Sequence, residues 1–436
     1  MKKILSMVMV FLLLVFGGQV VSASNESKSL QTLIDQAKPG DTLTLSPGQY
    51  VGHATVTKPL KIVGDEGVEI VAEKSDEKPV LTIEADDVVI KHLSIMDERD
   101  QPTIETIFIN SDNNELNHLS IETKGIGIQL DDAHHNTLSN ISMKGNDQAS
   151  FGQRGNGIDL WESNYNTITS SKITDVQDGV YLEDSRKNNI SKNEVTHSRY
   201  GYHLMFTEQT NVQSNQSFFN ISGIMVMGTE GTVVEANHLQ YNQKSVQSLG
   251  LLLFDVKDGF VANNVMADNR IGLYVESSMN NDIQMNESKR NYIGLQLKKA
   301  EDNHIVNNSL TANVVQGQAE ESSSNDTNGN YWDDHFSLDT DGDGVSNLTY
   351  KVDPFYLSLT EEYPAYQLFF QAPGLSFLEQ LFHTPTDQWV VDHEPLMEDP
   401  LLTETDDYHS SRHVLFMSTL LFIASITIIY LGVRKR

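Results

Sequence analysis

The middle of the chain reads Gly157-Ile-Asp-Leu-Trp, Gly179-Val-Tyr-Leu-Glu, Gly201-Tyr-His-Leu-Met and Gly223-Ile-Met-Val-Met. The same glycine-led alternation begins again at Gly127, Gly250, Gly272 and Gly294. Eleven residues after each glycine stands an apolar residue, and Ile90 and Leu116 continue that series upstream, with six of its nine steps equal to 22 residues. This period is too regular for chance and indicates a repeated structural unit.

Asparagine recurs at two places in the repeat. One set follows the apolar residue by three positions: Asn193, Asn215, Asn237, Asn264, Asn286 and Asn308. A second set precedes it by two: Asn114, Asn136, Asn166, Asn188, Asn281 and Asn303. Asparagine tolerates left-handed backbone and hydrogen-bonds to nearby main chain, and side chains stacked in successive coils can also bond to one another in ladders.

Short period-two segments punctuated by glycine and asparagine predict an all-β fold, a parallel β-solenoid of about ten coils of about 22 residues. A leucine-rich repeat has a similar period, but its consensus leucines and helical half are missing, and the glycine and asparagine density excludes an α-solenoid. Leu30, Leu33 and Ile34 share one face of a short helix that would cover the open edge of the first coil. We therefore expect the solenoid and its capping helix over residues 24–318.

Both ends of the chain are apolar. Residues 1–23 have the basic start, apolar run and small-residue end of a secretory signal peptide, with an uncleaved anchor as the alternative. Residues 414–433 carry no charge and are long enough for one transmembrane helix, and the basic tail 434–436 predicts a cytoplasmic C-terminus. The expectation is a single-pass membrane protein whose solenoid lies on the extracytoplasmic face. A sorting signal or lipid anchor is the alternative for the C-terminal run.

Composition limits the function. The 436 residues include no cysteine, which excludes disulfides, thiolate metal sites and thiol nucleophiles. Acidic residues number 60 and basic residues 30, a net charge of −30. A field of this sign repels nucleic acid, so DNA and RNA are not expected partners.

Two insertions lengthen the repeat, near residues 145–156 and 241–247. Both precede a repeat glycine, so both should emerge from the same edge of the rod. They bracket the coils that begin at Gly179, Gly201 and Gly223. The loops are therefore expected to flank the outward face of these coils.

Residues two and four positions after each glycine are expected to point outward. In two adjacent coils these positions hold His203, Met205, Met225 and Met227, about 5–7 Å apart by strand geometry. Imidazole and thioether are soft ligands that suit Cu(I), and no thiol competes with them in this chain. The alternative is that the methionines pack beneath a loop or a partner as a secondary core.

The same face carries acidic side chains, which many β-helices use with a basic residue to cleave or epimerise acidic polysaccharides. They are Asp131, Asp132, Asp159, Glu183 and Asp184. No His-Gly or Arg-x-Lys element accompanies them, and the net charge would repel a polyuronate. We interpret them as solvated edge residues and predict no catalytic residue.

A second cluster reads Asp339-Thr-Asp341-Gly-Asp343-Gly344, the spacing that begins a calcium loop. The expected bidentate acid is replaced by Tyr350, and Asp353 is the nearest substitute. The cluster predicts a structural Ca²⁺ site, with an ordinary acidic turn as the alternative.

Residues 319–410 form an acidic and then aromatic extension. Phe377, Leu378, Leu381 and Phe382 suit one face of a short helix. This segment either folds back on the rod or docks on a membrane partner.

Four features together resemble the NosD family of copper-site maturation proteins. They are the repeat lines from Gly157 to Met227, the run Gly329-Asn-Tyr-Trp-Asp-Asp, the acidic cluster and the aromatic segment to Phe382. The resemblance covers roughly residues 29–382. It implies an extracytoplasmic right-handed β-helix that is not an enzyme. The implied partners are an ABC transporter permease and its ATPase, a copper chaperone lipoprotein and nitrous oxide reductase, whose copper–sulfur centre these proteins assemble.

The resemblance also bears on the site. His203 and Met205 match the family line, whereas Met225 and Met227 rest mainly on the stacking of coils. Glu183 stands where a further methionine would extend the patch, and the C-terminal span departs from the soluble form of the family. A carbohydrate-binding or polysaccharide-modifying β-helix, with lyase or epimerase activity, and a docking scaffold without metal remain the alternatives.

Overall fold

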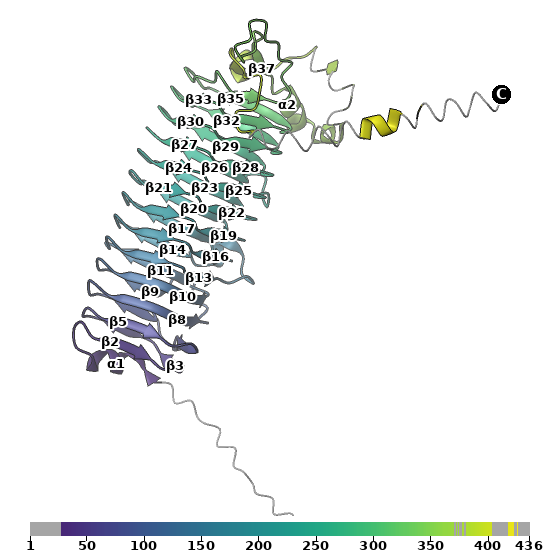
Figure 1. Ribbon diagram of the computed structural model, residues 1–436. Helices are drawn as coiled ribbons and strands as arrows, with labels where there is room; N and C mark the ends of the chain where they lie inside the picture. The colour runs from purple at the N-terminus through teal and green to yellow at the C-terminus, as the bar shows by residue number, and fades with distance from the viewer. Residues whose placement is uncertain are drawn as a thin grey trace, which may run out of the picture.

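The computed structural model describes residues 28–369, 372, 374, 377, 378, 381–402, 417–422 and 425. The described chain winds into an elongated parallel β-solenoid of about fourteen turns (Figure 1). This confirms the predicted all-β parallel solenoid, but the expected count of ten coils is wrong. The predicted signal peptide, residues 1–23, lies outside the described residues.

The turns that the sequence pattern missed lie at the two ends. Near the N-terminus Thr42 pairs with Lys61, and Lys61 pairs with Val89, so the first steps are not 22 residues long. These turns are built from valine, isoleucine and leucine without the asparagine signature. At the other end Leu310 pairs with Trp332, a large aromatic residue in a position that holds Ser288 and Leu310 in the two preceding turns.

Most turns contribute three strands, which stack into three columns. The first column consists of β2 (Thr42–Leu45), β5 (Lys61–Gly64), β8 (Val89–Asp97), β10 (Glu115–Thr123), β12 (Thr137–Ser139), β15 (Thr167–Thr169), β18 (Asn189–Ser191), β21 (Asn211–Gln213), β24 (Val233–Glu235), β27 (Phe260–Ala262), β30 (Asp282–Gln284) and β33 (His304–Val306). The second column consists of β1 (Lys28–Ser29), β3 (Gly48–Val51), β6 (Val68–Val71), the distal halves of β8 and β10, β13 (Ser142–Lys144), β16 (Lys172–Thr174), β19 (Glu194–Thr196), β22 (Gln216–Phe218), β25 (His238–Gln240), β28 (Val265–Ala267), β31 (Glu287–Lys289), β34 (Ser309–Thr311) and β36 (Tyr331–Trp332).

The third column is a separate twelve-stranded parallel sheet, and it carries the candidate site. Its strands are β4 (Ala54–Val56), β7 (Leu81–Ile83), β9 (Glu105–Ile109), β11 (Ile126–Asp131), β14 (Ile158–Trp161), β17 (Asp178–Glu183), β20 (Tyr200–Met205), β23 (Ser222–Met227), β26 (Leu249–Phe254), β29 (Ile271–Glu276), β32 (Ile293–Lys298) and β35 (Val315–Glu320). The inward side chains of all three columns form one continuous hydrophobic core along the rod.

Asparagine ladders connect the turns at the corners. The side-chain oxygen of Asn264 accepts the backbone N–H of Asn237, one turn earlier, at 2.9 Å, and its amide nitrogen donates to the carbonyl of Val234 at 2.8 Å. Both predicted ladders are confirmed by bonds of this kind. The structure adds a third ladder that the sequence analysis did not identify: Asn220, Asn242, Asn269, Asn291 and Asn313.

The repeat glycines are required by close stacking of the third column. A Cβ atom at Gly201 would overlap with the carbonyl oxygen of Gly223, and one at Gly223 would overlap with that of Gly250. Because these contacts are to backbone, no side-chain movement can relieve them. The glycine column therefore reflects the close approach of successive turns, which leaves no room for a side chain.

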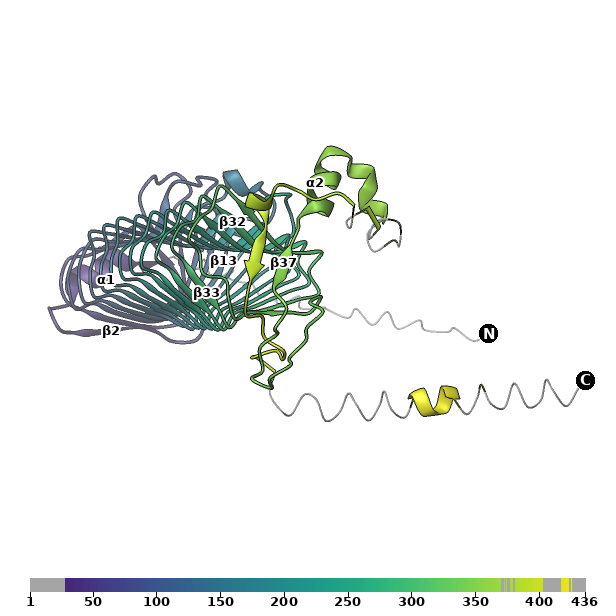
Figure 2. The ribbon, with the colours of Figure 1, turned by 90° about the horizontal axis from the view of Figure 1, so that it is seen from above.

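Caps cover both ends of the rod. Helix α1 (Leu30–Gln36) buries Leu30 and Ile34 against the first turns, as predicted, and Ser29 caps its N-terminus by accepting the N–H of Thr32. At the other end β37 (Tyr350–Val352) and β38 (Val390–Asp392) form an antiparallel pair that lies across the last turn (Figure 2).

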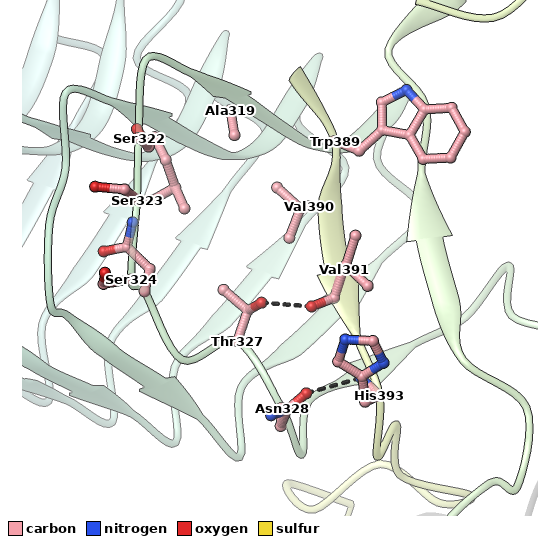
Figure 3. Close-up of a pocket in the computed structure, with 12 residues that line it drawn as sticks. Ala319, Ser322, Ser323, Ser324, Thr327, Asn328, Trp389, Val390, Val391 and His393 are labelled. Carbon is pink, nitrogen blue, oxygen red and sulfur yellow. Dashed lines mark hydrogen bonds between the residues drawn. The ribbon is translucent and has the colours of Figure 1, made fainter. Parts of the chain in front are cut away.

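Asp392 joins β38 to the rod. It is fully buried, and its carboxylate accepts the backbone N–H of Asn330 and the indole N–H of Trp332, both at 2.9 Å. The Thr327 hydroxyl donates to the carbonyl of Val391 at 2.7 Å (Figure 3). A cavity of about 260 Å³ remains between the last turn and β38.

The extension after the solenoid contains α2 (Phe355–Glu362), η2 (Pro364–Phe369) and η3 (Thr386–Gln388). Close to the C-terminus the described helical residues are 417–422 and 425. No helix among the described residues is long and apolar enough to cross a membrane, since a crossing takes about 20 apolar residues. This finding overturns the expectation of a single-pass membrane protein. The rest of the predicted span 414–433 and the tail 434–436 lie outside the described residues.

The ladder makes a quantitative prediction. Asn264→Ala leaves the buried N–H of Asn237 without its acceptor and removes a donor from the carbonyl of Val234. We expect a loss of about 2–4 kcal/mol in the free energy of unfolding, measured by chemical denaturation. Asn110→Ala, at an exposed asparagine outside the ladders, is the control and should change stability by less than about 0.5 kcal/mol. Equal effects of the two substitutions would contradict a supporting role for the ladder.

Candidate functional site

The four predicted copper ligands occupy a two-by-two patch on the outer face of the third column. In the pairing of β20 with β23, His203 stands opposite Met225 and Met205 opposite Met227. The alternate residues Tyr202, Leu204, Ile224 and Val226 belong to the hydrophobic core. The structure thus brings together the four residues in the predicted register.

The patch is more covered than an open sheet face. His203 and Met225 are each 7% exposed, while Met205 and Met227 are half-buried. Met225 packs with Leu249 and Leu252 in a small apolar cluster separate from the main core. The inner half of the patch is therefore a sheltered pair of donors, and the outer half is accessible from solvent.

The two inserted loops meet, as expected from their common edge. Lys244 of the second loop lies over the ring of Phe151 in η1 (Phe151–Gln153) of the first loop, 5.4 Å from its centroid. Arg154 of the first loop donates to the carbonyl of His197 at 2.9 Å. The loops thus join at one edge of the turns that carry the patch.

A buried carboxylate fixes His203. Nδ1 of His203 lies 2.9 Å from Oδ2 of Asp178, which is fully buried. Arg199 donates two hydrogen bonds to the same carboxylate, at 2.8 and 2.6 Å. Burial would raise the pKa of Asp178, but the hydrogen bonds from His203 and Arg199 outweigh it and hold that pKa below its usual value. Asp178 is therefore an anion that accepts a proton-bearing Nδ1.

This arrangement leaves Nε2 of His203 as the free ring nitrogen. Nε2 is buried and has no hydrogen-bond partner among the described residues. The imidazole is held between Tyr181 and Tyr200, with ring centroids 5.0 and 5.1 Å away. A histidine that donates through one nitrogen to a carboxylate and offers the other is the usual form of a metal-ligating histidine. The donor set of Nε2 with the methionine sulfurs suits a soft ion, Cu(I).

Tyr181 borders the outer half of the patch. Its hydroxyl donates to the carboxylate of Glu183 and lies 3.5 Å from the sulfur of Met205. Burial, with the charge of Glu183, raises the pKa of Tyr181, so the phenol stays protonated. Glu183 occupies the position one turn before Met205, where the sequence pattern noted the missing methionine.

Asp159 departs from the sequence-based interpretation. It was expected to be a solvated edge residue, but it is 2% exposed and its Oδ1 has no hydrogen-bond partner in the part of the chain that the structure describes. Its Oδ2 accepts from Asn156 at 3.3 Å, and Asn156 also accepts the backbone N–H of Asp178. Burial, reinforced by the charge of Asp178, raises the pKa of Asp159 to about 8, so this carboxyl is protonated at neutral pH.

Sequence reasoning missed Asp178 and Arg199 as members of the site. Both precede a repeat glycine, Asp178 by one residue and Arg199 by two. Most turns carry an uncharged residue directly before the repeat glycine, where Asp178 stands. An acid at this place, with an arginine near the same place one turn later, was the sequence signal that could have identified both residues. The alternation rule covered only the positions after the glycine and gave no reason to inspect those before it.

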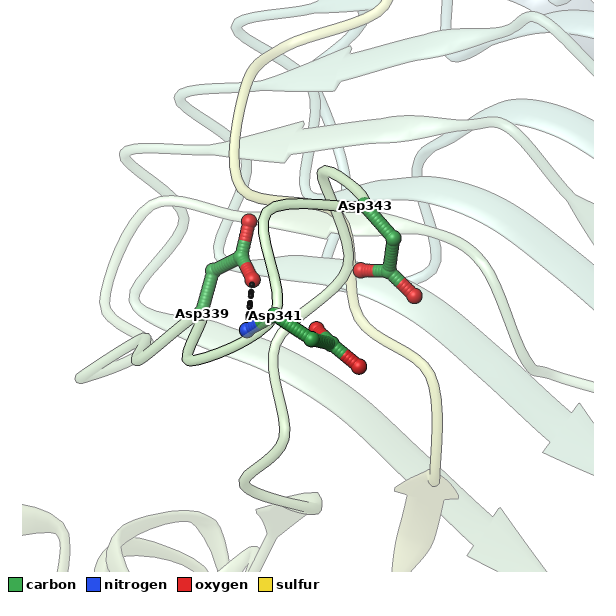
Figure 4. Close-up of side chains that lie close together, drawn as sticks. All are labelled: Asp339, Asp341 and Asp343. Atoms are coloured by element: carbon green, nitrogen blue, oxygen red, sulfur yellow. Dashed lines mark hydrogen bonds between the residues drawn. The ribbon is translucent and has the colours of Figure 1, made fainter.

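The acidic cluster lies far along the chain, in the loop before β37. Side-chain oxygens of Asp339, Asp341 and Asp343 lie within 4.8 Å of one another (Figure 4). Asp339 also accepts the backbone N–H groups of Gly342 and Gly344, and these bonds lower its pKa. The three carboxylates thus converge as the calcium-loop spacing predicts, on an exposed loop. Oxygen ligands of this kind fit Ca²⁺.

Residues 139–337 match the family described as periplasmic copper-binding protein (NosD), which confirms the resemblance for this part of the chain. A search of the curated proteins found no significant match.

Solved structures share the fold. A family 28 exopolygalacturonase from Yersinia enterocolitica aligns with a TM-score of 0.53 and 9% identity over 69% of this chain and 75% of the enzyme. The alginate lyase AlyF-OU02 aligns with a TM-score of 0.50 and 11% identity over 68% of this chain and 81% of the lyase. At such low identity these likenesses establish the β-helix and nothing about activity.

The buried carboxyl of Asp159 predicts that the stability of the fold depends on pH. In the unfolded chain Asp159 has a pKa of about 3.9. Between that value and the folded value of about 8, the folded protein keeps a proton that the unfolded chain has lost, so this group destabilises the fold increasingly as pH rises. Asp159→Asn removes the effect and should raise the free energy of unfolding by about 5 kcal/mol at pH 8 and hardly at all at pH 4.

Chemical denaturation at several pH values measures this difference. Asp131→Asn, at an exposed acid that stands opposite Trp161 of the next strand, β14, is the control and should show no pH-dependent gain. An unchanged stability of Asp159→Asn at pH 8 would show that Asp159 is ionised and solvated.

Proposed function

Because residues 139–337 of this chain are a NosD-family sequence, we propose that the protein is a non-enzymatic, extracytoplasmic accessory factor for assembly of the copper–sulfur centre of nitrous oxide reductase. In this proposal copper is cargo, held transiently as Cu(I) at His203, Met205, Met225 and Met227. The partners are an ABC transporter permease with its ATPase, a copper chaperone lipoprotein and the reductase.

One observation carries the proposal. Nε2 of His203 is buried without a hydrogen-bond partner in the described chain, and the residue beside His203 in register is Met225. A buried ring nitrogen without a hydrogen bond costs stability, so its retention next to a thioether favours a ligand role. Asp178 and Arg199 fix the ring so that Nε2, and not Nδ1, is the donor.

The environment suits transfer rather than storage. Thioether ligands hold Cu(I) less tightly than thiolates, and this chain has no cysteine. Met205 and Met227 are half-buried at the open side of the patch, so an incoming ligand from a donor or acceptor protein can reach the ion from that side.

The C-terminal extension supports a membrane-embedded partner. Its exposed apolar side chains include Leu368, 87% exposed, and Phe369, 53% exposed, with Phe377, Leu381 and Phe382 further along. Residues 354–382 contain no lysine or arginine, so the segment lacks the cations that attract anionic lipid headgroups. An apolar surface of this composition favours contact with the permease itself.

A polysaccharide-modifying β-helix is the second candidate. Asp159 and Asp178 have pKa values shifted in opposite directions, a pattern typical of a general acid and a general base. Asp178 is, however, fully buried and already bonded to Arg199 and His203. Uronate lyase or epimerase activity that is lost in Asp159→Asn would establish this function in place of copper handling.

The copper proposal is tested by replacing sulfur without changing volume. The triple variant Met205→Leu, Met225→Leu and Met227→Leu should keep its stability within about 1 kcal/mol. Its affinity for Cu(I), measured by anaerobic competition with a chromogenic chelator, should fall at least about tenfold. Maturation of the reductase should fall in parallel.

Met266→Leu, at a buried core methionine, is the matched control and should bind Cu(I) as the parent does. If the triple variant is stable, binds Cu(I) with the parent's affinity and supports maturation of the reductase as the parent does, the protein is a docking scaffold without metal. Unfolding of the triple variant would show that the methionines are core residues.

We also propose that the acidic loop holds a structural Ca²⁺. An ion that binds only the folded state raises the melting temperature of the protein. Millimolar Ca²⁺ should therefore raise that temperature by a few degrees. Asp341→Ala combined with Asp343→Ala should abolish this shift, whereas Asp65→Ala, at an exposed acid elsewhere, should retain it. A full response of the double variant would place the Ca²⁺ effect outside this loop.

A further inference from the structure

Arg270 of the rod has no acidic partner among the described residues. Among the described residues, five arginines form ion pairs with carboxylates: Arg99, Arg154, Arg186, Arg199 and Arg290. Arg270 is the sixth, and no described carboxylate pairs with it. In a chain with 60 acidic and 30 basic residues, an arginine without an acid is the exception that needs an explanation.

Arg270 is nevertheless held in place. Its guanidinium lies over the ring of Tyr292, 4.2 Å from the centroid. The hydroxyl of Tyr292 is hydrogen-bonded to Thr360 of α2 at 3.0 Å, and Thr360 is 2% exposed. The ring is therefore fixed where α2 meets the solenoid. Stacking uses the face of the guanidinium and leaves its in-plane N–H donors for another group.

A cavity opens beside this arginine. Its volume is about 350 Å³, and its lining includes Gln243, Asn269, Arg270, Arg290, Asn291 and Tyr292. Arg290 is neutralised by a two-bond pair with Asp268, at 2.6 and 3.0 Å. Asn269 and Asn291 are committed to the third ladder. Arg270 thus supplies one uncompensated positive charge to a polar cavity in a strongly acidic protein.

We propose that Arg270 receives the carboxylate of an aspartate or glutamate side chain from the membrane protein that docks on the apolar extension, so this inference rests on the proposed function. The bond from Tyr292 to Thr360 links the lining of the cavity to α2, the first helix of that extension. Stacked arginine and tyrosine are typical anchors of protein interfaces, and a planar guanidinium binds a carboxylate through two parallel hydrogen bonds.

The charge of the protein favours this occupant over an acidic polysaccharide. The net charge of −30 opposes the approach of a polymer with a carboxylate on every unit. A partner that carries a single acid on an otherwise apolar surface avoids that repulsion. The same field rejects acidic surfaces that do not reach Arg270, which makes the contact selective.

The test measures binding of the full-length protein to the detergent-solubilised permease–ATPase complex. Arg270→Gln removes the charge and should weaken binding at least about tenfold. Arg270→Lys keeps the charge without the planar fork and should give an intermediate loss. Arg186→Gln, at an exposed pair with Glu208 in the middle of the rod, is the control and should stay within about twofold of the parent. Melting temperatures verify that each variant folds.

The outcomes separate the two proposals. If a folded Arg270→Gln variant binds the permease–ATPase complex as the parent does, this inference is overturned, but the proposed docking partner is not. A parent protein that does not bind the complex overturns the partner and this inference together. Millimolar galacturonate is the second probe: saturable binding to the parent that is lost in Arg270→Gln would identify a small-molecule site and overturn the docking role.

Discussion

The structure depends on the hydrogen bond from the backbone N–H of one asparagine to the side-chain oxygen of the asparagine one turn later. Nearly all ladder asparagines also donate to a backbone carbonyl of the previous turn, as Asn215 and Asn264 do. A shift of one residue in any turn would break both bonds and leave buried polar groups unpaired. From Asn114 onward the ladders therefore fix the register of each turn against the next, independently of the hydrophobic core.

A fixed register turns distance along the sequence into distance in space. Residues 22 positions apart become neighbours on one face, as His203 and Met225 show. This is why the repeat, the outward patch and two of the three ladders were predictable from the sequence. The first turns were not, because Thr42, Lys61 and Val89 pair at other spacings, and hydrophobic segments alone do not define a period.

The repeat pattern also could not predict which side chains of the site are buried. Alternation places Asp159 on the outer face of the sheet, but it does not say what lies above that face. The end of the inserted loop supplies Asn156, which donates to Asp159, and burial converts this apparent surface acid into a protonated one. Whether Asp178 is solvent-exposed or enclosed depends in the same way on Arg199, whose side chain reaches back across one turn. Such long-range cover depends on loop length and conformation, which vary outside the repeat.

The rod separates two activities that the proposals assign to it. The patch lies in β20 and β23, and five further strands of the third column follow β20 before its end at β35. At about 4.8 Å per turn, roughly 24 Å separates His203 from the end of the column near which the apolar extension begins. In a stack whose register is fixed by buried hydrogen bonds, that separation cannot shorten by sliding of the turns. In the proposed function, a partner on the extension and a partner at the patch of His203 and the methionines would therefore meet different parts of a rigid surface. Exchange of copper at the patch would not require release of the partner on the extension.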